Sequence, residues 1–235
     1  MIDVDNLPLQ NDAIAPAGWG LILAGLALGL ALLIGGPVAL GVPALITGIL
    51  FPALPLFALA VSAGRGRTGL FRPLRLKDAF LIPAFAALAI ILTLLAALAI
   101  SDIAPTATNP IFAQIQSQDG FDFILQLLST LPSLLGEELL AILPMLAVTS
   151  FLRSRTGMDD GTSLAFGIFT GWLIFCLAHL PTYDWNVAQC FGIIGTARLV
   201  FTLAFLVTRN LWVSFGAHVA TDWTELIFAR HFDQP

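Results

Sequence analysis

Charged residues are scarce in this sequence: Asp, Glu, Lys and Arg make up 11% of its 235 residues, against about 25% in an average soluble domain. So few charges cannot cover the surface of a soluble globular protein. The net charge of −5 and the lack of a basic stripe exclude a nucleic-acid-binding protein. Because 58% of the residues are hydrophobic, intrinsic disorder is excluded as well. The composition therefore indicates an integral membrane protein.

Cysteine is also scarce, and the two residues present, Cys176 and Cys190, lie inside apolar stretches. They form neither a disulfide framework nor a CxxC metal pair. Lys and Arg are missing from residues 1–11, which carry Asp3 and Asp5. A secretory signal begins with a positively charged region, so we expect no cleaved signal peptide.

Long apolar runs dominate the chain, and a helix needs about 20 such residues to cross a bilayer. The run at 121–152 is overlong for one crossing, so we expect it to tilt, to kink near Pro132 or Pro144, or to begin as an interfacial helix. The predicted fold is all-α, a polytopic transmembrane helix bundle of about seven spans, with eight as the alternative count. The spans lie at about 17–34, 37–63, 79–100, 121–152, 161–180, 187–208 and 211–228.

The chain divides into a cytoplasmic N-terminal segment (1–16), three accessory transmembrane helices (17–100), a polar loop (101–120) and a motif-bearing helix bundle (121–235). Its short loops differ in basic residues, because the loops at 101–120 and 181–186 contain none. The positive-inside rule then predicts a cytoplasmic N-terminus in the cytoplasmic (inner) membrane. The basic loop residues are Arg65, Arg67, Arg72, Arg75, Lys77, Arg153, Arg155 and Arg209.

Ionisable residues at membrane depth are confined to the last four spans. A charge at the bilayer centre costs at least about 2.5–3.5 kcal/mol on insertion scales. Interhelical polar contacts return only about 0.6 kcal/mol each, so a functional polar cavity is favoured over a set of purely structural contacts. The residues are Glu137, Glu138, His179, Arg198, His218, Asp222 and Glu225.

The spacing of these residues narrows their chemistry. Glu137 and Glu138 are adjacent and point about 100° apart on a helix, so one can face a cavity while the other faces a neighbouring helix. His218 and Asp222 are four residues apart and share one helical face. Two histidines, His179 and His218, with a carboxylate are enough to hold an attacking water or to form an open metal site.

Three segments occur in order on successive spans: the Glu-Glu pair within Gly136–Leu140, FxxxH at Phe175–His179 and HxxxD at His218–Asp222. This ordered set resembles the CPBP family of intramembrane proteases, also called the Abi or CAAX-protease family. The resemblance covers about residues 131–223, and the run at 210–214 also resembles the lead-in to the family's last motif.

One position departs from the family pattern. The family has an Arg four residues after the second Glu, where this sequence has Ile142. Arg198, near the middle of another span, is the hypothesised source of the missing guanidinium. Phe175, the first residue of FxxxH, is expected to support the site by packing.

The resemblance implies a membrane-embedded endopeptidase in which Glu137 is the general base that activates a water. His179 would hold that water or a metal that carries it. His218 would stabilise the oxyanion or complete the metal site, with Asp222 orienting it because an ionised carboxylate cannot donate a hydrogen bond. Glu138 would tune Glu137.

The cofactor implied is a zinc ion held by His179, His218 and Glu137, and a metal-free, glutamate-held water is the alternative. The implied substrate is a membrane-embedded or lipid-modified peptide, such as a prenylated C-terminal tail, met within the lipid bilayer. Two other functions stay open: a non-catalytic immunity or scaffold member of the same family, and a proton- or cation-coupled transporter that uses the same carboxylates.

Residue counting raises one difficulty for a single site. It places Glu137 near mid-bilayer and His218 in the inner half, but His179 near the outer end of its span. At 1.5 Å per residue the mismatch is on the order of 10 Å or more, so a single site requires a tilt, a kink or a shifted span boundary.

Overall fold

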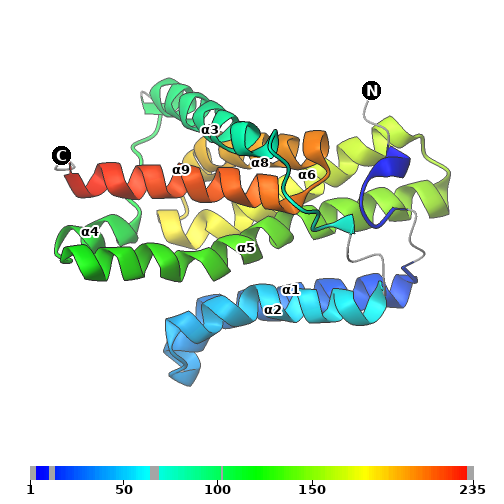
Figure 1. The fold of residues 1–235 in the computed structure, drawn as a ribbon, viewed down its shortest axis with the longest axis horizontal. Coiled ribbons are helices and arrows are strands. Elements are labelled where there is room, and N and C mark those ends of the chain that lie inside the picture. Colours follow the sequence, from blue (N-terminus) through cyan, green and yellow to red (C-terminus); the bar gives the residue numbers. More distant parts are fainter. Residues whose placement is uncertain (1–3, 11–13, 64–68, 102, 232–235) are drawn as a thin grey trace.

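The computed structural model describes residues 4–10, 14–63, 69–101 and 103–231, and within these ranges every regular element is a helix (Figure 1). The all-α fold class is therefore confirmed. The long helices are α1 (Pro16–Leu40), α2 (Ala44–Ser62), α3 (Asp78–Ser101), α5 (Gly120–Phe151), α6 (Asp160–His179), α8 (Gly195–Thr208) and α9 (Leu211–His231). Shorter elements lie before and between them: η1 (Val4–Asn6), α4 (Pro110–Gln116), η3 (Leu152–Thr156), η4 (Leu180–Tyr183), α7 (Val187–Gln189) and η5 (Cys190–Ile194).

Within the described ranges, six helical stretches are long and apolar enough to cross a membrane, which makes this an integral membrane protein. The seventh expected span is present as α9, but it is not among the six because His218, Asp222 and Glu225 make it more polar. It packs against α3, α5 and α8, inside the bundle, where ionisable side chains can find partners. The six stretches are Pro16–Leu40, Ala44–Ser62, Asp78–Ser101, Gly120–Thr156, Asp160–Tyr183 and Val187–Thr208.

Helix α5 is the central element of the bundle. It runs for 32 residues through both Pro132 and Pro144, and it contacts α1, α2, α6, α8 and α9. Asp119 caps its N-terminus by accepting a hydrogen bond from the backbone N–H of Asp122, as short polar residues do at helix starts. Asp159 caps α6 in the same way, and the backbone N–H of Thr162 lowers the pKa of this carboxyl.

The three accessory helices do not form one unit. Helices α1 and α2 make a hairpin that packs on α5, whereas α3 packs on α8 and α9, and Figure 1 shows α3 on the opposite side of the bundle from the hairpin. A Cβ on Gly29 would come within 2.7 Å of the carbonyl oxygen of Phe51, so glycine is required for this close approach. The three helices expected within 17–100 are thus divided between two sides of the bundle, and the domain division itself stays a prediction.

The expected polar loop at 101–120 is also more ordered than predicted. Pro110–Gln116 forms α4, with Asn109 accepting a hydrogen bond from the backbone N–H of Ile111. Ile115 is fully buried and belongs to a small apolar cluster with Phe123 and Leu226. The high polar content of the segment concealed this apolar anchor.

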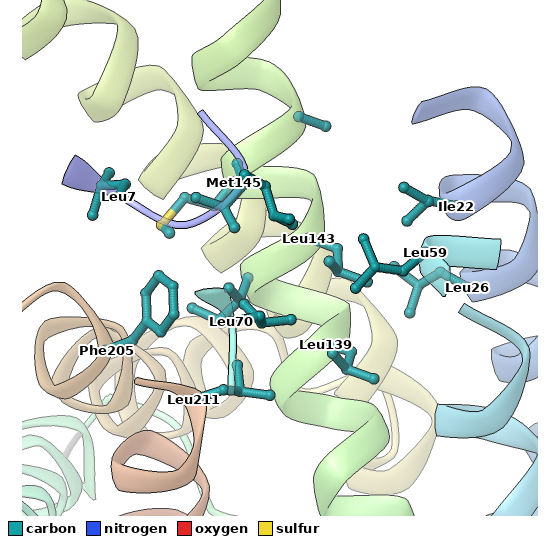
Figure 2. Packing of buried hydrophobic residues seen from close by; sticks show 14 of the residues in the cluster. Leu7, Ile22, Leu26, Leu59, Leu70, Leu139, Leu143, Met145, Phe205 and Leu211 are labelled. Carbon is teal, nitrogen blue, oxygen red and sulfur yellow. The ribbon is translucent and has the colours of Figure 1, made fainter. Parts of the chain in front are cut away.

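The main apolar core lies around α5, with α1 and α2 on one side and the turn that joins α8 to α9 on the other (Figure 2). Leu70, Leu143, Phe205 and Leu211 are each fully buried in it. The N-terminal segment packs here too, because Leu7 is buried in the same core. This core closes one end of the bundle, beyond the polar site described next.

Candidate active site

The adjacent glutamates of α5 face different surroundings. Glu138 is fully buried, whereas the side chain of Glu137 keeps 21% of its surface exposed. This is the outcome expected for neighbouring positions that point about 100° apart on a helix. Each carboxylate can therefore serve a separate purpose.

Glu138 is paired with Arg198 of α8 through two hydrogen bonds. Arg198 Nη1 donates to Glu138 Oε1 at 2.8 Å and Nη2 donates to Oε2 at 3.1 Å. Neither side chain is exposed. The guanidinium therefore does come from another helix, and Ile142, where the family has its Arg, is fully buried in the apolar core.

Helix α9 supplies two further donors to Glu138. The hydroxyl of Ser214 donates to Oε2, and His218 Nδ1 donates to Oε1 at 2.9 Å. With the guanidinium, these donors satisfy both carboxylate oxygens, as a buried charge requires. Glu138 thereby ties α5, α8 and α9 together and fixes the orientation of the His218 ring.

Glu137 faces the Nε2 atoms of both histidines. Its Oε2 lies 3.6 Å from His179 Nε2 and 3.8 Å from His218 Nε2. The other ring nitrogens are already used, because His179 Nδ1 donates to the carbonyl oxygen of Phe175 at 2.8 Å and His218 Nδ1 donates to Glu138. In neutral rings both Nε2 lone pairs would point at a carboxylate, so a proton, a water or a metal ion is needed between these groups.

Aromatic rings hold the histidines and the guanidinium from the sides. Phe175 lies 4.3 Å from the His179 ring and Phe201 stacks on His218 at 4.6 Å between centroids. Arg198 lies over both phenylalanine rings, at 5.3 and 5.4 Å from their centroids, within cation–π range. Phe201 was not predicted from the sequence, and its position three residues after Arg198, on the same face of α8, is the signal that points to it.

The register of α5 and α6 explains how His179 reaches Glu137. A Cβ on Gly171 would overlap the carbonyl oxygen of Ala141, so these antiparallel helices touch at that level. Eight residues further along α6, His179 lies about one turn past the level of Glu137. Side chains lean toward the N-terminus of their own helix, so these two lean toward each other.

The predicted depth mismatch is therefore wrong. The residue counting assumed that the middle of every span lies at the centre of the bilayer. In the structure, the C-terminal end of α6 lies level with the middle of the longer helix α5. Glu137, His179 and His218, from three helices, lie at one place in the bundle.

Asp222 lies one turn beyond His218, with its Oδ1 3.6 Å from His218 Nε2. This distance is too long for a hydrogen bond, so the hydrogen bond that orients the ring comes from Glu138. Asp222 and Glu225 line the same cavity as Glu137. Its volume of about 480 Å³ lies in the range of small-molecule pockets.

The zinc ion held by His179, His218 and Glu137 stays a prediction. Among the residues that the structure describes, no three His, Cys, Asp or Glu side chains form a group that could hold a metal ion. The Nε2 atoms of His179 and His218 both face Glu137 Oε2, and His218 Nε2 also faces Asp222. The mechanism proposed below is written for a water held by protein groups, and the chelator experiment described there tests the metal.

Comparison with known families identifies this part of the chain. Residues 119–224 match the family model described as "Type II CAAX prenyl endopeptidase Rce1-like". The match covers α5 to α8 and α9 as far as residue 224, which confirms the resemblance to the CPBP/CAAX-protease family. It includes the interacting side chains of the site, while the cavity residue Glu225 lies just beyond it. No curated protein and no solved structure matches the chain.

Proposed function

Because residues 119–224 are an Rce1-like domain of the CAAX-protease family, we propose that this protein is an intramembrane endopeptidase whose water is activated by Glu137. The observation that carries the proposal is the convergence of Glu137 Oε2 on two Nε2 atoms, 3.6 and 3.8 Å away, at a cavity wall. Peptidase activity is the family-level function, and the roles of the individual residues are our proposal.

The attacking water is placed between Glu137 and His179. A water about 2.8 Å from both atoms spans their 3.6 Å separation with ordinary hydrogen bonds. The neutral His179 ring accepts one water hydrogen at Nε2, because its Nδ1 proton is held by Phe175. The Glu137 carboxylate accepts the other, which aims an oxygen lone pair at a peptide carbonyl carbon.

Attack forms the carbon–oxygen bond and moves one water proton to Glu137. The carbonyl electrons go to the oxygen, which becomes an oxyanion. Collapse of this intermediate breaks the carbon–nitrogen bond, and Glu137 returns the proton to the leaving amine. The second water hydrogen stays on the new carboxylic acid, which then loses this proton to the released amine, so the products are a carboxylate and an ammonium group and Glu137 is again ionised.

His218 stabilises the oxyanion when its ring carries both protons. Its Nδ1–H is held by Glu138 at 2.9 Å, so its Nε2–H faces the cavity and can donate. Glu138 and Asp222 offset the positive charge of the ring from two sides. A donor fixed before the reaction costs no reorganisation when the oxyanion forms.

The test uses the purified full chain in lipid nanodiscs with an internally quenched peptide that contains a transmembrane segment. We expect Glu137→Gln to lose about 10²–10⁴-fold in kcat, the usual contribution of a general base. Glu225→Gln is the matched control, because Glu225 lines the cavity but is placed in no catalytic step. A chelator arm is run beside them.

Equal activity of Glu137→Gln and the parent chain would refute the general-base role. Loss of activity in chelator, restored by zinc, would assign the water to a metal. No cleavage by the parent chain of quenched transmembrane or prenylated peptides would favour a non-catalytic family member.

A further inference from the structure

The cavity has its mouth at one end of the bundle. The residues around this mouth come from the segment before α4 and from η4, and Thr106, Thr108 and Thr182 are exposed there. Asp184 and Trp185 form the adjoining turn, with Trp185 70% exposed. A peptide can therefore reach Glu137 from this end.

The other end is closed by the apolar core shown in Figure 2. Beyond the Glu138–Arg198 pair lie Leu143, Phe205 and Leu211, none of which is exposed. Leu70 fills the same region from the chain that leads to α3. The site is thus reached from one side of the bundle and sealed from the other.

Basic residues gather at the sealed end. The connections α2 to α3, α5 to α6 and α8 to α9 lie away from the C-terminal end in Figure 1, and they carry Arg72, Arg75, Lys77, Arg153, Arg155 and Arg209. Arg65 and Arg67 belong to the first of these connections in the sequence but lie outside the described residues. The loops at 101–120 and 181–186 contain no Lys or Arg, and they surround the mouth. Among the described residues, Arg230 in the last turn of α9 is the one arginine at this end, where it donates to the carbonyl oxygen of Gln118.

The positive-inside rule places short loops rich in Lys and Arg in the cytoplasm. Applied to this bundle, it puts the sealed end in the cytoplasm and the mouth on the opposite side of the membrane. The rule and the position of the cavity are independent observations, one from the charges and one from the packing.

We propose, resting on the proposed endopeptidase activity, that the site takes its substrate from the non-cytoplasmic side. The substrate class is then the membrane-proximal, non-cytoplasmic segment of a membrane-anchored protein. It is not the free prenylated tail of a cytosolic protein, because prenyl-Cys tails are made on cytosolic C-termini.

The charges of the cavity also favour an internal peptide segment over a free C-terminal tail. The lining of the cavity includes three carboxylates, those of Glu137, Asp222 and Glu225. The only lining side chains that can carry a positive charge are the two histidines, His179 and His218, because no lining residue is Lys or Arg. In a C-a-a-X tail the terminal carboxylate lies three residues from the prenylated Cys, and so would enter this acidic cavity without a lysine or arginine to receive it. An internal peptide bond brings no such charge.

Sidedness is tested by labelling engineered cysteines in right-side-out spheroplasts with a membrane-impermeant maleimide. Thr108→Cys reports the mouth and Ser154→Cys reports the sealed end, where Ser154 is exposed. The parent chain is the blank, since Cys176 and Cys190 are both buried. We expect Thr108→Cys to label fully in intact spheroplasts and Ser154→Cys to label only after permeabilisation.

Substrate choice is tested with detergent-solubilised protein, where sidedness is removed. We expect cleavage of a quenched internal transmembrane peptide and loss of most of that activity on a farnesylated C-a-a-X tetrapeptide. Amidation of the tetrapeptide's C-terminus should recover part of the loss, because it removes the carboxylate.

Failure of this inference and failure of the proposed function give different results. Labelling of Ser154→Cys, and not Thr108→Cys, in intact spheroplasts would overturn the inference while leaving proteolysis untouched. Preferred cleavage of the farnesylated tetrapeptide would overturn it as well. Correct labelling with no cleavage of any peptide would leave the orientation standing and refute the endopeptidase.

Discussion

Replacing Arg198 with Leu should destabilise the bundle strongly, because it leaves Glu138 as a buried carboxylate without its main counter-charge. Arg198 donates two of the hydrogen bonds that Glu138 accepts, and Ser214 and His218 provide the others. Removing one partner of a buried ion pair costs about 3–5 kcal/mol. That is a factor of roughly 10²–10³ or more in the ratio of folded to unfolded protein.

The expected shift in melting temperature is about 6–20 °C, at roughly 2–4 °C per kcal/mol for a chain of this size. Cys176 and Cys190 provide the assay, since both are buried and free and react with a thiol-sensitive dye only as the bundle opens on heating. The parent chain in the same detergent gives the reference curve.

Two companion variants separate the pair's contribution to stability from its contribution to the site. Arg198→Leu combined with Glu138→Leu removes both charges, so most of the lost stability should return. This double variant should be inactive, because His218 loses the hydrogen bond to Glu138 that orients its ring. Ile142→Arg in the Arg198→Leu background puts a guanidinium one turn from Glu138 on the same helix, and it should recover part of both stability and activity.

The charge-pair explanation fails under either of two results. One is an Arg198→Leu chain that melts within about 2 °C of the parent, less than 1 kcal/mol at this size. The other is a double variant that melts no higher than Arg198→Leu alone, which would mean that the arginine acts by filling space.

Two further substitutions test the chemistry and the packing. Asp222→Asn supplies an amide that can donate a hydrogen bond to an oxyanion beside His218. The kcat for the quenched peptide should therefore be kept or raised. A loss of activity as large as that of Glu137→Gln would show that the carboxylate itself is needed. Gly171→Val should cost about 1–3 kcal/mol in stability, since any Cβ there meets Ala141. It should also lower kcat by displacing His179. An unchanged melting curve in the thiol-dye assay together with an unchanged kcat would contradict the close helix contact.

The fold class and the residues that meet at the site were accessible from the sequence, because apolar runs of span length and ionisable residues among them are strong signals. Glu137, His179 and His218 could be named from motif order alone. Their distances could not, since these depend on the register of α5 against α6. That register is set by the glycines at 167 and 171, whose close contacts leave no trace in hydropathy.

The arrangement of the first three spans could not be predicted for a similar reason. Each is uniformly apolar, so no face of the helix indicates its neighbour. Only the packing shows that α3 joins α8 and α9 and that Thr93 of α3 lines the cavity. Phe201 could be found only through its position three residues after Arg198, because a phenylalanine in an apolar span carries no signal of its own.

The Glu138–Arg198 pair has a consequence for how relatives of this protein are recognised. A pattern that demands an arginine four letters after the second glutamate would reject this chain at Ile142, although its folded form presents a guanidinium to that carboxylate. What the buried acid requires is a cation within reach, and any helix that borders it can provide one. Members of such a group are better sorted by whether some neighbouring segment offers that cation than by the letters of a single segment.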